Sequence, residues 1–244
     1  MRQSVFVTLV IIIALVVAIC VYSFLLPEHI KRGGYLVIGL IALSILSGTF
    51  IFERFLTLRR AEGRGHLAHF IAAFRAVVNE GRIDEAVKLC EKQGGALANV
   101  LRAGLLSYQE TGESDMTTYE KQDVTRRAID EANLLEAPLL ERNLIALSTI
   151  ASIATMVGLL GTTIGMIRSF KAMATTGAPD AIQLALGISE ALVNTAGGLI
   201  VAIMSIVAYN FFVNKVDSLN YMIDEAAHEM LNQVNALLRG RRRA

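Results

Sequence analysis

The chain has 244 residues, of which 54% are hydrophobic and 18% charged, with a mean hydropathy of +0.51 and a formal net charge of +1. Its apolar residues come in long blocks, which is typical of an integral membrane protein rather than of a soluble domain. The near-zero net charge offers no overall field for nucleic acid, so we expect no such partner. Among the four histidines only His66 and His69 share a helical face, and no third ligand stands near them, so we expect no metal and no cofactor.

Residues 1–34 contain a first apolar stretch, 4–26, and then a short polar turn. A signal peptide is one interpretation, but the apolar core is long for one and the cleavage signal is weak. A retained, additional hydrophobic helix is favoured. Residues 35–58 form a second apolar stretch that ends in Arg54, Arg59 and Arg60, which places this end in the cytoplasm by the positive-inside rule.

Residues 59–147 are predicted to form a cytoplasmic helical domain. Gly81 ends one helix, and the Gly94-Gly95 pair separates amphipathic helices at 83–92 and 96–108. No nucleophile with a neighbouring base, phosphate loop or metal cluster stands out, so we expect no enzyme.

A longer helix is predicted to follow in the same domain and to continue into the membrane, with a kink at Pro138. Ser114 and Asp115 are its expected caps. Its expected apolar face follows helical spacing and consists of Val124, Ile129, Leu134, Leu135, Leu139 and Leu140.

Two more membrane helices are predicted at 148–171 and 182–213, joined by a periplasmic turn at 172–181. Residues 214–244 continue as a cytoplasmic helix with a basic tail. Four spans in all would place both termini in the cytoplasm.

Small and hydroxyl-bearing residues line one face of the helix predicted at 148–171. They recur at spacings of three and four and are Ser148, Ser152, Thr155, Gly158, Thr162, Gly165 and Ser169. One interpretation is close helix packing, in which hydroxyls bond across the interface. The other is the wetted lining of an ion path, and the two are compatible.

Glu190 is a carboxylate inside the last apolar run, where an ionisable group normally faces protein or water and not lipid. We interpret it as part of an ion path, together with Thr195 and, in a small or polar sector of the same helix, Asn194 and Ser205. Glu190 and Thr195 lie about 140° apart at roughly 100° per residue, so they cannot serve the same point of a regular helix. In one arrangement Glu190 faces an adjacent subunit or the lumen, and Thr195 turns toward the helix at 148–171. The alternative is a protonated Glu190 that bonds a neighbouring hydroxyl and serves packing alone.

The sequence resembles the MotA/TolQ/ExbB proton-channel family, and more closely its ExbB/TolQ branch. The resemblance covers roughly residues 35–212. It is carried, in the family's order, by Phe52-Glu53-Arg54 to Ala61, Asp84-Glu85-Ala86 to Leu105, Leu139 to Leu144, Gly158-Leu159-Leu160-Gly161-Thr162 to Phe170, and Gly187-Ile188-Ser189-Glu190 to Asn210.

The resemblance implies an all-α protein of the bacterial inner membrane, whose copies form a ring, usually a pentamer. The ring would surround the single membrane helix of an ExbD/TolR-like partner that carries an aspartate. Proton flow would then drive work on a periplasmic load, with a TonB/TolA-like protein that spans the periplasm as a further expected partner. Glu190, Thr195 and Thr162 match the family's functional glutamate and threonines.

The sequence also departs from the family's pattern. Proline is common in the family at the positions of Thr155 and Met204, so straighter helices are expected here, and Asn194 replaces a small apolar residue. Two other functions stay open: a sodium-driven stator, which the hydroxyls of Thr155 and Thr162 and the amide of Asn194 would allow, and a non-conducting membrane scaffold.

Overall fold

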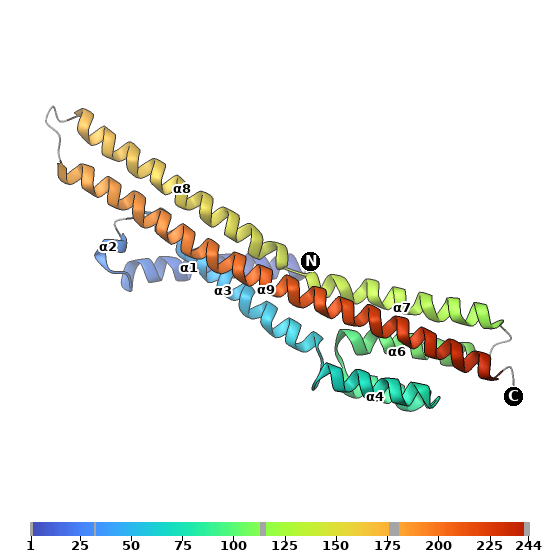
Figure 1. The fold of residues 1–244 in the computed structure, drawn as a ribbon. Helices are drawn as coiled ribbons and strands as arrows, with labels where there is room; N and C mark the ends of the chain where they lie inside the picture. Colours follow the sequence, from blue (N-terminus) through green and yellow to red (C-terminus); the bar gives the residue numbers. More distant parts are fainter. Residues whose placement is uncertain (1, 32, 113–115, 176–180, 242–244) are drawn as a thin grey trace. The chain divides into compact units, whose positions relative to one another are not determined.

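The computed structural model describes residues 2–31, 33–112, 116–175 and 181–241, and every regular element within them is an α-helix (Figure 1). The predicted all-α class is confirmed. The predicted caps Ser114 and Asp115, and residues 176–180 of the periplasmic turn predicted at 172–181, lie outside these ranges, whereas residues 172–175 are helical. The chain divides into two compact units, Met1–Arg54 with Asn143–Phe211 and Phe55–Arg142 with Phe212–Ala244. We describe each unit by itself.

Three helical stretches of the described chain are long and apolar enough to cross a membrane. They are Leu36–Ala61, a segment within Thr118–Met173 and a segment within Ala181–Ala236. The N-terminal apolar stretch also forms a helix, α1 (Arg2–Phe24), of which Thr8–Phe24 is a shorter apolar segment. That α1 is an additional membrane span stays a prediction.

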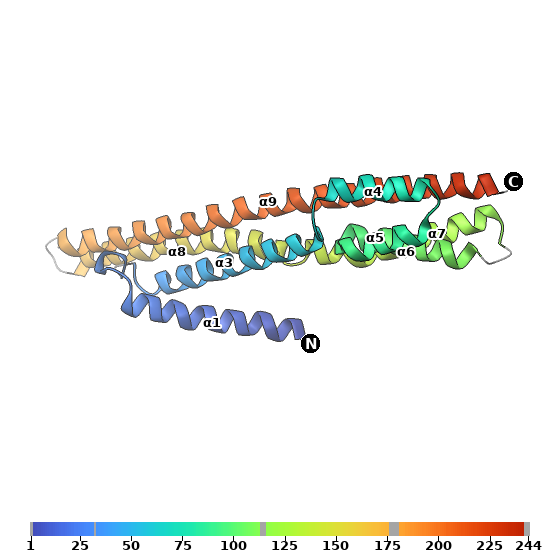
Figure 2. The same ribbon diagram turned by 90° about the horizontal axis from the view of Figure 1, so that it is seen from below.

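The first unit contains α1, the short α2 (Glu28–Lys31), most of α3 (Leu36–Ala61), α8 (Leu144–Thr175) and the first part of α9 (Ala181–Arg241). Here α8 and α9 run antiparallel, side by side (Figures 1 and 2). Many of their large apolar side chains, such as Leu159, Ile167, Leu192 and Ile200, point outward and are exposed in the single chain. This arrangement suits helices surrounded by lipid or by other membrane helices.

Small residues form the contact between α8 and α9, which we call the glycine seam: Gly158, Gly161 and Gly165 of α8 against Gly187, Ala191, Asn194 and Gly198 of α9. A Cβ added at Gly165 would lie 2.6 Å from the Gly187 carbonyl oxygen, so the two backbones touch. At the same interface the Ser169 hydroxyl donates to the Leu184 carbonyl at 3.1 Å. For this part of the predicted stripe, the structure gives helix packing.

The second unit contains the end of α3, then α4 (Leu67–Asn79), α5 (Ile83–Gln93), α6 (Gly95–Gly112), α7 (Thr118–Glu141) and the rest of α9. The helix boundaries predicted from Gly81 and Gly94-Gly95 are confirmed, and all three glycines have positive φ, at 74°, 63° and 85°. The buried apolar core of the unit draws on every one of these helices and includes Leu58, Phe74, Ala86, Leu101, Ile129 and Ile223.

The prediction for the long helix is wrong at both ends. Thr117 is the N-cap of α7, in a capping box in which its hydroxyl accepts from the Glu120 amide and the Glu120 carboxylate accepts from the Thr117 amide. At the other end α7 stops at Glu141, because Asn143 has a φ of 60°, and α8 starts afresh at Leu144. The helix therefore does not run continuously into the membrane.

The predicted apolar face of α7 is only partly correct. Ile129 and Leu140 are buried, whereas Leu134 and Leu135 are each 74% exposed in the single chain.

Candidate functional site

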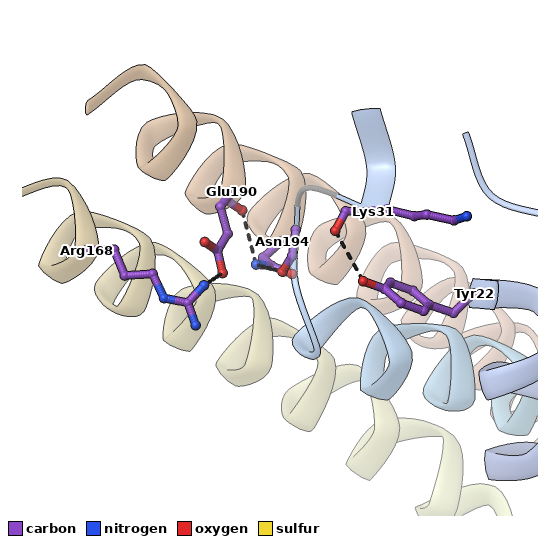
Figure 3. A network of polar contacts seen from close by, with 6 residues as sticks. Tyr22, Lys31, Arg168, Glu190 and Asn194 are labelled. Atoms are coloured by element: carbon purple, nitrogen blue, oxygen red, sulfur yellow. Dashed lines mark hydrogen bonds and ion pairs between the residues drawn. The ribbon is translucent and has the colours of Figure 1, made fainter. Parts of the chain in front are cut away.

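Glu190 lies in the third turn of α9, and only 9% of its surface is exposed. Its carboxylate forms an ion pair with the guanidinium of Arg168, which reaches across from α8 (Figure 3). Glu190 is therefore not an isolated charge, and its neighbour is a cation instead of the hydroxyl considered above.

Arg168 was missed as a site residue in the sequence. The available signal was that it is the single charged residue between Leu144 and Phe170. A charged group inside a membrane helix is costly unless it is paired or hydrated. Two such residues on neighbouring apolar helices are thus candidates to pair with each other, and the seam brings them together.

Asn194 lies one turn after Glu190 and is fully buried. Its side-chain amide donates to the Gly33 carbonyl at 2.8 Å and to the Glu190 carbonyl at 3.0 Å. Gly33 belongs to the turn between α2 and α3. Asn194 therefore ties α9 to the chain segment that precedes α3.

Thr195 faces α8, as expected, and its hydroxyl donates to the Gly158 carbonyl at 3.1 Å.

On α8, the Thr162 hydroxyl donates to the Leu159 carbonyl at 2.6 Å and the Thr155 hydroxyl to the Ala151 carbonyl at 3.0 Å. Thr155 is exposed and Thr162 half-buried in the single chain. Both of these hydroxyls keep an oxygen lone pair available outside their own helix.

Ser205 is fully buried further along α9, where its hydroxyl lies 2.7 Å from that of Ser47 on α3. It is 15 residues after Glu190, which corresponds to about 22 Å along a helix. The structure thus brings Glu190 and Asn194 together with Arg168 and the turn at Gly33, and leaves Thr155 and Ser205 elsewhere on the helices.

The apolar helices, the glycine seam and the ion pair at the buried Glu190 define a multi-pass helical membrane protein with a charged site between two of its membrane helices. The model of the MotA/TolQ/ExbB proton channel family matches residues 93–225, more than half of the chain. The chain belongs to this family, in its ExbB/TolQ branch.

Individual relatives agree with this assignment. The Tol-Pal system protein TolQ of Pseudomonas aeruginosa is 30% identical over 177 residues, which cover 71% of this chain and 74% of that protein. The biopolymer transport protein ExbB of Pseudomonas putida is 31% identical over 198 residues, which cover 80% of this chain and 57% of that protein. The ExbB-like 3 biopolymer transport protein of Synechocystis sp. is 43% identical over 89 residues, 36% of this chain and 42% of that protein. The chain thus matches less than two thirds of the length of the last two.

Proposed function

We propose that this chain is the channel-forming subunit of an ExbB/TolQ-type motor in a bacterial inner membrane, which converts the proton motive force into mechanical work. The support comes from membership of the family, from the names of the relatives, and from the apolar helices. The C-terminus would lie in the cytoplasm, on the same side as the basic end of α3.

The observation that carries the proposal is the ion pair between the buried carboxylate of Glu190 and the partly exposed guanidinium of Arg168. Arg168 of α8 and Glu190 of α9 place charges among the apolar residues of two neighbouring helices, although apolar residues there would insert at lower cost. A charge retained at such a depth is more often part of an ion route than of a packing contact. In our proposal Glu190 exchanges protons along the path, and Arg168 is the counter-ion of its charged form.

The path would be built by several copies of the chain together with a partner. The glycine seam leaves no room for water between α8 and α9 of one copy, since their backbones are in contact. The hydroxyls of Thr155 and Thr162, which are not enclosed in the single chain, would face the interior of a homo-oligomer, in our proposal a pentamer. An ExbD/TolR-like helix with an aspartate would occupy this interior, and a TonB/TolA-like protein would carry the work to the load.

The test is ion flux in liposomes that contain this chain and its single-span partner. We expect Glu190→Gln to abolish proton flux, because a neutral amide cannot exchange a proton. The matched control is Glu131→Gln, an exposed glutamate of the second unit, which should leave the flux unchanged. Equal flux in both variants would remove the proposal. Flux that follows a sodium gradient and ignores pH would instead select the sodium-driven stator.

A non-conducting scaffold is the second candidate, and one observation favours it. The side chains of Asn194, Thr195 and Ser205 all bond to other helices or turns of the same chain, as packing residues do. A scaffold would still assemble with its partners after Glu190→Gln and would show no proton flux even with the native sequence. Co-purification of the partner, measured alongside flux, separates the two functions.

A further inference from the structure

The turn that leads into α3 lies directly against the Glu190 carboxylate. A Cβ added at Gly34 would stand 2.8 Å from the Glu190 Oε1 atom and 3.7 Å from the Arg168 Nη1 atom. The backbone of the turn therefore covers the Glu190 carboxylate, whereas the Arg168 side chain stays partly exposed. Gly34 has a φ of 70°, which a glycine adopts without strain.

Asn194 fixes this turn in place. Its amide group bonds to the Gly33 carbonyl and is buried, so the contact is shielded from competing water. A Cβ at Gly33 would lie 3.0 Å from Val193 Cγ1 and 3.3 Å from Asn194 Oδ1, so the turn packs closely on α9. The same Asn194 amide group also bonds to the Glu190 carbonyl, and the turn and the site therefore share one anchor.

The other side of the turn is held by α1. The Tyr22 hydroxyl donates to the Lys31 carbonyl at 3.3 Å (Figure 3). The Lys31 ammonium donates to the Ser23 carbonyl at 3.2 Å. The contacts between α1 and the end of α2 thus hold the turn from one side, while α9 holds it from the other.

We propose that the Gly33-Gly34 turn, Asn194 and Arg168 are positioning residues that hold the Glu190 carboxylate in a closed, paired state. Arg168 fixes the carboxylate by charge, and the turn covers it. Ion transfer through Glu190 would require this cover to move. That this turn controls ion flow rests on the proposed function, whereas its contact with the Glu190 carboxylate does not depend on that function.

The experiment measures how fast an apolar carbodiimide modifies Glu190 in liposomes that contain this chain alone, with the modified residue located by mass spectrometry. Gly34→Ala would displace the flexible end of the Glu190 side chain, and Asn194→Ala would release the turn. Both should raise the modification of Glu190 severalfold. Arg168→Gln should raise it as well, and Arg168→Lys, which keeps the charge, should restore a rate near that of the native chain.

Two matched controls separate this effect from general damage. Gly65→Ala places alanine at a φ of 92° with no atom within 4 Å, so it carries the backbone strain without the contact. Ser47→Ala removes another buried polar contact, the one between α3 and α9. Both should leave the rate near that of the native chain.

Rates for Gly34→Ala and Asn194→Ala no higher than those of the controls would overturn the proposal. Gel-filtration profiles identify any variant that fails to fold. Alanine at Gly34 also strains the backbone, and Asn194→Ala tests the covering role of the turn without that strain. If these variants modify Glu190 faster but the native chain with its partner conducts no protons, the covering role of the turn is supported and the proposed function is rejected.

Discussion

Asn143 donates a hydrogen bond from its side-chain amide to the carboxylate of Glu53 at 3.3 Å, although the two residues are 90 positions apart. The same carboxylate accepts two hydrogen bonds from Arg54, both at 2.9 Å. The Arg54 side chain is fully buried. This cluster connects α3 with the start of α8, and its residues lie in two of the segments on which the family resemblance depends.

Removal of the carboxylate from this cluster should destabilise the protein. We expect Glu53→Ala to lower the free energy of unfolding by about 3 kcal/mol, because it takes the adjacent carboxylate away from a buried guanidinium. Denaturant unfolding in detergent micelles measures the change. The matched control is Asp123→Ala, which breaks an exposed pair with Arg127 and should cost less than about 1 kcal/mol. Equal losses in the two variants would contradict the prediction.

The glycine seam should tolerate no added bulk. Gly165→Val would push a side chain against the Gly187 carbonyl and the Ala191 backbone, which cannot rotate away, and we expect a loss of about 1–3 kcal/mol. Gly48→Val on α3 has no neighbour within 4 Å and serves as the control. Thermal unfolding of both variants in the same detergent tests this, and a Gly165→Val protein as stable as the control would show that the seam is looser than described.

Cys90 should be unreactive in the folded protein. Burial raises the pKa of its thiol from 9.0 to about 12, and the nearby Arg102 offsets only part of this rise. In a Cys20→Ala background, iodoacetamide at pH 8 should therefore modify the native chain slowly and the unfolded chain quickly, as read from the mass. Because the folded state holds the thiol proton more tightly, the stability that this group contributes is present below pH 9 and decreases as the pH rises toward about 12. Rapid modification of the native chain at pH 8 would contradict the burial of Cys90.

The mature protein should retain α1. Ala14 and Ala18 are buried in the folded chain, and Tyr22 bonds to the turn beside Glu190, so α1 is an integrated helix. The intact mass of protein purified from membranes measures this directly. A chain that begins after Tyr22 would instead favour the signal-peptide interpretation.

Much of the fold was predictable because the local signals are strong. The apolar runs gave the long helices, and Gly81 and Gly94-Gly95 marked helix boundaries that only glycine makes easily. The cap of α7 is also readable in the sequence, since Thr117 and Glu120 have the spacing of a capping box, although Ser114 and Asp115 offer competing cap residues nearby. The break at Asn143 was harder to foresee, because asparagine adopts a positive φ only in a suitable tertiary setting.

The site was less predictable than the fold. Glu190 stands out by itself as a charge in an apolar run, but helical geometry indicates only that Glu190 and Thr195 point in different directions, and both reach residues of α8. The pairing with Arg168 depends on how α8 and α9 pack against each other, and the contact of Asn194 with Gly33 joins residues 161 positions apart. Neither relationship has a signal in local periodicity.

The contact between α8 and α9 also affects how altered copies would behave in a cell. The backbones of α8 and α9 touch within one chain, so in the proposed homo-oligomer each ion route would draw on neighbouring copies, and one defective copy would impair the routes it shares. Glu190→Gln expressed beside the native gene should then be dominant, reducing transport by more than its fraction of the total protein.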